Sequence, residues 1–171
     1  MPMNPSTPMT GWFDTYGLDE NAREDVSGIH SASQQVLNWI EQELTSHPGL
    51  RSDHVFLGGF SQGGALTMYT SLTAPRRLAA AIALSCWLPL IHEFPDALSQ
   101  ANRHLRLMQI HGKFDDTVSL AWSQRSEANL TRWLGADHFS YKVFDDVPHN
   151  VTAEEMRQVR QFLVTTHLEV D

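Results

Sequence analysis

The sequence predicts an α/β domain in which helices flank a mostly parallel β-sheet. Short runs of β-branched and aromatic residues alternate with segments whose apolar residues recur at helical spacing. From Leu78 up to Ser85 the chain is continuously apolar, which is typical of a strand buried on both faces of a parallel sheet. The 171 residues are 42% hydrophobic and 19% charged, so we expect one compact domain over residues 1–171.

The predicted elements follow an irregular lead-in over residues 1–26, with Trp12 and Phe13 as its large anchors. Ser27 is expected to cap a first helix that runs to about Ser46. The later elements are expected to be a strand at His54–Phe60, a helix at Ala65–Leu72, strands at Leu78–Ser85 and Leu105–Ile110, a helix at Ser119–Leu134, a strand at Phe139–Phe144 and a last helix.

The last helix has a predicted start and a predicted buried face. Thr152 and Glu155 have the spacing of a capping box, in which each side chain bonds to the backbone amide of the other residue. The apolar residues expected to face the core are Met156, Val159, Phe162 and Leu163.

Charge and composition argue against several classes of partner and cofactor. Twelve Lys and Arg against twenty Asp and Glu give a formal net charge of −8, whereas proteins that bind nucleic acids usually carry positive charge. The basic residues form no run that would hold the chain on an anionic membrane, and the most apolar stretch is too short to span a bilayer. The single Cys86 and the absence of histidines at HxxxH spacing predict no intrachain disulfide and no metal site. No other cofactor is expected. Since the amino terminus does not resemble a signal peptide, we expect a cytoplasmic protein.

One motif indicates nucleophilic chemistry. Gly59-Phe60-Ser61-Gln62-Gly63 matches G-x-S-x-G and joins a predicted strand directly to a predicted helix. This context is typical of a nucleophile elbow, a sharp turn that exposes a reactive serine. Strand and helix come so close at such a turn that Gly59 and Gly63 are expected to be needed for their lack of a side chain. The alternatives are a turn in which Ser61 only caps the helix, and a phosphate-binding loop, whose glycine spacings do not fit.

A serine nucleophile needs a histidine base and a carboxylate that orients the base. In this kind of fold the three occur in the order serine, acid, histidine, each on a loop at the carboxyl end of a strand. Asp115 and Asp116 both follow the third predicted strand, and the spacing alone does not choose between them. His149 lies between the last strand and the last helix, so it is the predicted base. The remaining candidates are expected to be structural or exposed, namely His111, His138 and His167.

Several further segments are characteristic of one family. They are Trp12-Phe13-Asp14, Glu24-Asp25 with Gly28-Ile29, Gly58 to Ala65, Leu84 to Pro89, and His111-Gly112-x-x-Asp115-x-x-Val118. Through them the chain resembles, from about Pro8 to Leu168, the acyl-protein thioesterase/lysophospholipase/carboxylesterase family of α/β-hydrolases. The resemblance implies a three-layer α/β/α fold.

The resemblance also implies roles for individual residues. It makes Ser61 the nucleophile, Asp115 rather than Asp116 the acid, and His149 the base. The backbone amide of Gln62 would be an oxyanion donor. Trp87 and Leu88 would line a groove for the acyl chain, although a plain hydrophobic corner explains these two residues equally well.

The activity implied by the resemblance is hydrolysis of acyl thioesters or esters. The main expected reaction is the removal of palmitoyl-like chains from protein cysteines. S-acylated proteins, small acyl esters and lysophospholipids are the expected substrates, and a lysophospholipase or carboxylesterase is the alternative. The sequence has no counterpart of the family's amino-terminal strands or of its His-Gly-Leu-Gly-Asp oxyanion loop. A second alternative is therefore a catalytically weak relative that binds acylated partners. With those strands missing, we expect the strand at 54–60 to form an open edge through which the chain self-associates.

Overall fold

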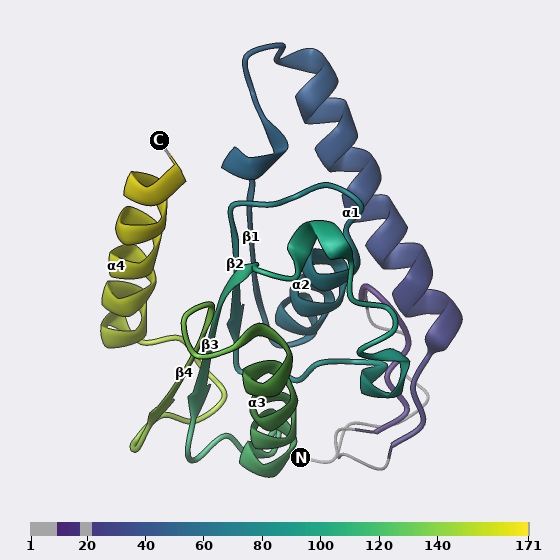
Figure 1. The fold of residues 1–171 in the computed structure, drawn as a ribbon. Coiled ribbons are helices and arrows are strands. Elements are labelled where there is room, and N and C mark those ends of the chain that lie inside the picture. Colours follow the sequence, from purple (N-terminus) through teal and green to yellow (C-terminus); the bar gives the residue numbers. More distant parts are fainter. Residues whose placement is uncertain (1–9, 18–21, 171) are drawn as a thin grey trace.

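Helices cover both faces of a four-stranded sheet in the computed structural model, which describes residues 10–17 and 22–170 (Figure 1). The helices and strands in chain order are α1 Val26–Ser46, β1 Phe56–Phe60, α2 Gln62–Thr73, β2 Ala80–Leu84, β3 Arg106–Gly112, α3 Leu120–Leu134, β4 Phe139–Phe144 and α4 Ala153–Val170. Short 3₁₀ turns occupy Ser52–His54, Ile91–Glu93 and Gln100–Asn102. The alternation of strands and helices agrees with the sequence prediction.

The strands stand in the order β1-β2-β3-β4, and every neighbouring pair is parallel. Phe60 pairs with Leu84, and Leu84 pairs with Ile110, so these three strands reach the same level at their carboxyl ends. In a parallel sheet the loops that follow the strands meet at one edge, where α/β proteins place their functional residues. The loops after β1, β3 and β4 therefore converge.

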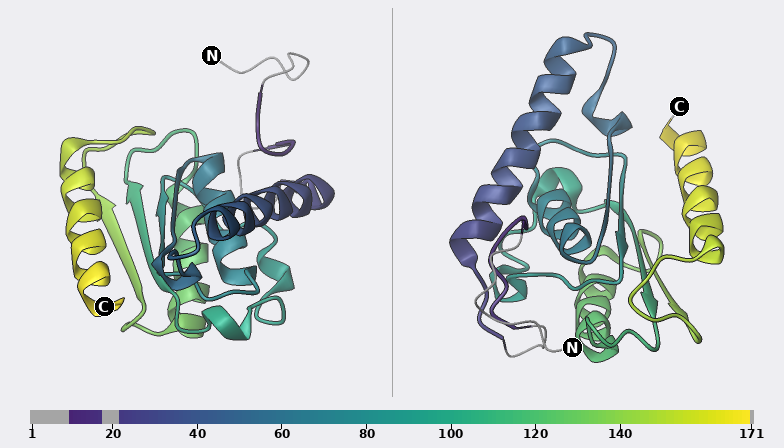
Figure 2. Two further views of the ribbon diagram at one scale, coloured as in Figure 1. Left: turned by 90° about the horizontal axis from the view of Figure 1, so that it is seen from above. Right: turned by 180° about the vertical axis from the view of Figure 1, so that it is seen from behind.

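Two apolar clusters hold the helices on the sheet, one cluster on each face. Figure 2 shows α4 on one face and α1, α2 and α3 on the other. Successive residues of a strand point to opposite faces, so Leu107 joins the larger cluster beneath α2 and α3 while Met108 joins the smaller one. Val159 of α4 packs in the smaller cluster against Ile82 and Ile110. This confirms the predicted three-layer α/β/α arrangement with a parallel sheet.

Several local predictions are wrong. Helix α1 begins at Val26 and is capped by Asp25 instead of Ser27, because the Asp25 carboxylate accepts a hydrogen bond from the Gly28 amide at 2.9 Å. Strand β1 begins at Phe56, since the residues before Val55 form a 3₁₀ turn.

The predicted buried stripe of α4 is confirmed for Val159, Phe162 and Leu163, which pack in or against the smaller cluster, and is wrong for Met156. Met156 is 48% exposed, whereas Glu155 is buried and Val159 packs on the sheet. Glu155 forms the predicted capping box, in which its carboxylate accepts from the Thr152 amide at 2.6 Å. Thr152 Oγ1 in turn accepts from the Glu155 amide at 3.3 Å.

The described part of the lead-in lies against α1 and the start of α2. The rings of Trp12 and Trp39 meet edge to face with centroids 6.0 Å apart, and Thr15 forms an antiparallel bridge with Glu24. Among the described residues β1 has β2 as its single strand neighbour, so it is the edge of the described sheet, as predicted. Within the same residues, no helix combines the length and apolar character needed to cross a membrane.

Candidate active site

Ser61 stands on the turn between β1 and α2, at the carboxyl end of the sheet. Its backbone has φ 53° and ψ −125°, a conformation that residues other than glycine rarely adopt. The Ser61 amide donates to the Leu84 carbonyl at 2.8 Å, and the Ser61 carbonyl accepts from the Ala65 amide at 3.0 Å. The strand ladder thus continues up to the residue that opens the helix, and the turn has the form of a nucleophile elbow.

Two glycines make this turn sterically possible. A Cβ on Gly59 would lie 2.2 Å from the carbonyl oxygen of Gly63, and a Cβ on Gly64 would lie 2.8 Å from Cys86 Sγ. Both distances are far below normal contact, so the close approach of strand and helix depends on the missing side chains. The prediction for Gly63 is wrong, because a Cβ there would meet Trp12 Nε1 at an ordinary 3.7 Å.

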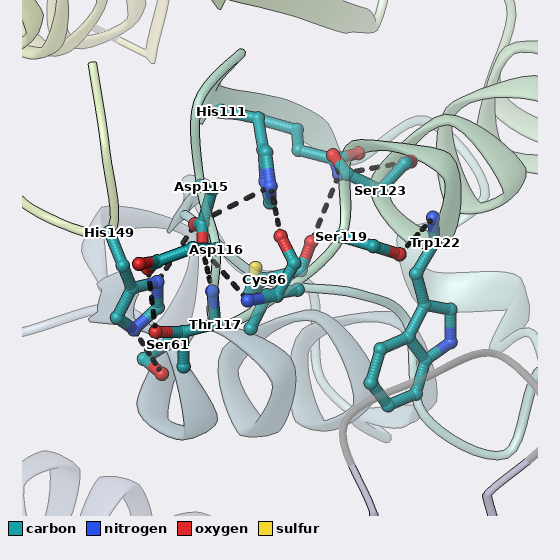
Figure 3. A network of polar contacts seen from close by, with 12 residues as sticks. Ser61, Cys86, His111, Asp115, Asp116, Thr117, Ser119, Trp122, Ser123 and His149 are labelled. Carbon is teal, nitrogen blue, oxygen red and sulfur yellow. Dashed lines mark hydrogen bonds and ion pairs between the residues drawn. The ribbon is translucent and has the colours of Figure 1, made fainter. Parts of the chain in front are cut away.

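Ser61, His149 and Asp115 form a continuous chain of hydrogen bonds (Figure 3). His149 Nε2 lies 2.9 Å from Ser61 Oγ, and His149 Nδ1 lies 2.8 Å from Asp115 Oδ2. The three residues come from the loops after β1, β4 and β3, and the Ser61–His149 pair spans 88 positions of sequence. An ionised carboxylate only accepts hydrogen bonds, so Nδ1 carries the imidazole proton and Nε2 can accept the serine proton.

The structure distinguishes the two candidate aspartates. The Asp115 side chain is fully buried, and its Oδ1 accepts from the backbone amides of Thr117 and Val118 at 3.0 and 2.8 Å. Asp116 is exposed, and its carboxylate accepts from the Thr117 hydroxyl at 3.3 Å. Asp115, the acid that the family resemblance implies, is therefore the one beside His149.

The other side of His149 is apolar. The rings of His149 and Phe60 have centroids 4.7 Å apart, and Phe60 remains partly exposed.

The other candidate histidines lie elsewhere. His138, on the loop before β4, contacts His104, while the side chain of His167 lies outside the described residues. The described residues include no group of three or more His, Cys, Asp or Glu side chains that could hold a metal ion.

Gln62 combines a helix-terminal amide with a side chain that holds the lead-in. It is the first residue of α2, and the first amides of a helix have no acceptor within that helix. Its Oε1 accepts from the Trp12 amide at 2.8 Å, and its Nε2 donates to the Phe13 carbonyl at 2.7 Å and to Thr15 Oγ1 at 3.1 Å. Sequence reasoning identified the amide and missed the side chain, because no local pattern links residues 49 positions apart.

Trp87 and Leu88 belong to the core of this structure. They are 3% and 2% exposed, and Trp87 stacks on Trp122 with ring centroids 4.1 Å apart. Trp87 also borders a small cavity beneath the lead-in. An acyl-chain groove at these residues stays a prediction. Cys86 is fully buried, and burial raises the pKa of its thiol, which disfavours the nucleophilic thiolate.

His111 lies closer to the candidate site than sequence reasoning expected. It is fully buried at the end of β3, and its Nε2 lies 2.9 Å from the Val118 carbonyl oxygen and 3.5 Å from Asp115 Oδ2. The signal was present in the sequence as the four-residue spacing of His111 and Asp115 within one motif. That spacing alone does not show whether the imidazole turns toward the carboxylate.

Comparison with known proteins gives two curated relatives that cover most of the chain. Acyl-protein thioesterase 1 of Mycosarcoma maydis is 31% identical over 171 residues, covering 94% of this chain and 71% of the relative. Acyl-protein thioesterase 1 of Gibberella zeae is 34% identical over 168 residues, covering 94% of this chain and 70% of the relative.

Solved structures have the same fold. Zea mays acyl-protein thioesterase 2 superposes with a TM-score of 0.80 at 27% identity, covering 93% of this chain and 73% of that one. Arabidopsis thaliana SOBER1 superposes with a TM-score of 0.84 at 24% identity, covering 91% of this chain and 73% of that one, which is a likeness of fold alone. The family model described as phospholipase/carboxylesterase matches residues 1–167. The chain therefore belongs to the phospholipase/carboxylesterase family of α/β-hydrolases, and it is a serine hydrolase.

Proposed function

We propose that this chain hydrolyses acyl thioesters, and in particular those that join long-chain fatty acids to protein cysteines. The observation that carries the proposal is the hydrogen-bond chain from Ser61 Oγ through His149 to the buried Asp115 carboxylate. The thioester preference is supported by the two fungal relatives, which are both acyl-protein thioesterases.

In the proposed reaction Ser61 Oγ attacks the acyl carbonyl carbon while His149 Nε2 accepts the hydroxyl proton. Asp115 keeps the other imidazole proton on Nδ1 and stabilises the imidazolium that forms. The tetrahedral intermediate then collapses, and the cysteine sulfur leaves with the proton held on Nε2. Water activated by the same imidazole finally hydrolyses the acyl-Ser61 ester and regenerates the free serine.

The negative charge of the tetrahedral intermediate needs hydrogen-bond donors. We assign one of these to the backbone amide of Gln62, which follows the nucleophile at the positive end of the α2 dipole. This amide is free of helical hydrogen bonding because of its terminal position. The side chain of Gln62, bound to the lead-in, restrains the residue that carries the amide.

Apolar side chains beside the triad favour a fatty acyl substrate. Phe60 precedes Ser61 and remains 37% exposed, and Phe114 precedes Asp115 and is 63% exposed. The Phe60 ring, which lies against His149, offers apolar surface to an acyl chain. The formal net charge of −8 disfavours tight capture of anionic bilayers. We therefore expect single-chain acyl thioesters to be preferred over phospholipids in membranes.

A fluorophosphonate probe followed by peptide mapping tests the nucleophile. We expect the adduct on Ser61, loss of labelling in Ser61→Ala, and normal labelling in Ser119→Ala, a matched substitution at the cap of α3. Labelling at another residue, or labelling that survives Ser61→Ala, would contradict the assignment.

Substrate competition tests the substrate class. We expect a palmitoyl thioester of a cysteine peptide to be cleaved faster than a diacyl phospholipid presented in vesicles. Hydrolysis of the vesicle lipid at an equal or greater rate would refute the thioester proposal.

Carboxylic esters, including lysophospholipids, are the second candidate substrates. The phospholipase/carboxylesterase description of the matching family favours them, and the same serine chemistry cleaves them. Comparing kcat/KM for a lysophospholipid and for a thioester of the same acyl length ranks the two classes. A higher value for the lysophospholipid would make it the preferred substrate.

A further inference from the structure

We propose that His111 is a positioning residue for the Asp115 carboxylate. It hydrogen-bonds to the turn at residues 115–118, and the backbone amides of this turn hold the carboxylate in place. The inference rests on the proposed function, because it assigns a further role at the same site. His111 lies on β3, four residues before Asp115, and both side chains are fully buried. Figure 3 shows the His111 ring turned toward Asp115, on the side away from Ser61.

The surroundings of His111 determine where its ring proton lies. Nε2 is 2.9 Å from the Val118 carbonyl oxygen and 3.5 Å from Asp115 Oδ2, and both of these oxygens only accept. Nε2 therefore carries the proton and donates it to the Val118 carbonyl. Nδ1 is buried and has no hydrogen-bond partner among the described residues, which agrees with an unprotonated nitrogen.

Val118 connects this imidazole to the acid. The Val118 carbonyl accepts a hydrogen bond from His111 Nε2, while the amide of the same residue donates to Asp115 Oδ1 at 2.8 Å. The Thr117 amide donates to the same oxygen at 3.0 Å. A shift of Val118 would therefore move an amide that holds the carboxylate. His111 acts on Asp115 mainly through this closed turn.

A neutral donor suits this position. The Asp115 oxygen nearest to His111 is also the one that accepts from His149, at 2.8 Å. A positive charge on His111 would compete with the imidazolium of His149 for that oxygen. Burial lowers the pKa of His111, so the ring supplies a hydrogen bond without adding a charge.

The same face of β3 provides a matched control. Gln109 is as fully buried as His111 and lies two residues earlier on that face. Its amide donates to Ser123 Oγ at 2.8 Å, and none of its hydrogen bonds within the described residues reaches Asp115. Replacing Gln109 with Leu therefore removes a buried polar group from the strand without touching the turn at Asp115.

The experiment compares His111→Leu, His111→Gln and Gln109→Leu. We measure kcat and KM for a long-chain acyl thioester, and the proton NMR signal of the hydrogen between His149 Nδ1 and Asp115. We expect His111→Leu to lower kcat about 10²-fold without a matching change in KM, since a small misplacement of a catalytic group costs about that much. His111→Gln keeps an N–H donor at similar reach, so it should restore most of the loss. Gln109→Leu should retain the parental kcat.

Several results would overturn the positioning role. These are a parental kcat and an unmoved His149 proton signal in His111→Leu, no restoration by His111→Gln, or an equal loss of kcat in Gln109→Leu. If His111→Leu fails to fold, His111→Asn replaces it with the same expectation, because its shorter amide cannot reach the Val118 carbonyl. If the parental chain cleaves no acyl thioester, the NMR measurement still tests the inference separately from the proposed function.

Discussion

Gly64 lies so close to Cys86 that a Cβ on the glycine would come within 2.8 Å of the buried Sγ, and within 3.0 Å of the Gly59 carbonyl oxygen. Gly63, one residue earlier, has room for a methyl group. We expect Gly64→Ala to destabilise the fold by about 1–3 kcal/mol through overpacking. Gly63→Ala should be neutral or stabilising by up to about 1 kcal/mol, because alanine favours the helix. Urea denaturation of both variants checks the difference, and equal losses would contradict it.

Asp115 and Asp116 are adjacent in sequence, and we expect their amide variants to differ sharply in activity. Asp115→Asn should lower kcat by about 10⁴-fold, the loss that a serine protease suffers when its histidine adopts the wrong tautomer. Asp116→Asn should change kcat little, because that carboxylate is exposed and bonds to the Thr117 hydroxyl. Steady-state kinetics with an acyl thioester makes the comparison, and the opposite ranking would assign the role of acid to Asp116.

Buried His111 makes the stability of the fold depend on pH. Burial lowers the pKa of His111 in the folded chain below its ordinary value of 6.5, so the unfolded chain binds this proton more readily. The contribution of the neutral His111 ring to stability is complete above the pKa that His111 has in the unfolded chain. It is lost as the pH falls through the lower pKa that His111 has in the folded chain. His111→Gln should therefore lose less stability than the parent between about pH 7.5 and about pH 5.5. Urea unfolding at both values checks this, and parallel losses would contradict it.

The position of β1 at the edge of the described sheet predicts self-association. Strand edges with unpaired backbone groups recruit other chains, and a lysine on the edge discourages such pairing. Gly58 in β1 is exposed, and a Cβ there would make contacts of ordinary length with Ile82. We expect the chain to form dimers or larger species as its concentration rises, and Gly58→Lys to shift it toward monomer. Sedimentation velocity measures both, and a parental chain that stays monomeric at high concentration would disprove the prediction.

The amino-acid sequence by itself determined the order of the elements and several local motifs of this protein. The alternation of apolar runs and helical periodicity predicted the order of strands and helices, because backbone preference and the spacing of apolar residues are properties of short segments. The same local logic identified the elbow at Ser61 and the capping box at Thr152. The order of Ser61, two adjacent aspartates and His149 indicated which loops would meet in a parallel sheet.

Only the tertiary structure decided the contacts that cross between elements. It brings Asp115 to His149, leaves Asp116 exposed, and makes Gly64 rather than Gly63 the tight position behind the elbow. It also turns His111 toward Asp115 and joins the Gln62 side chain to the lead-in. These contacts depend on the register of the sheet and on how each helix is rotated against it. Both follow from packing the whole core, so no short segment of sequence contains them.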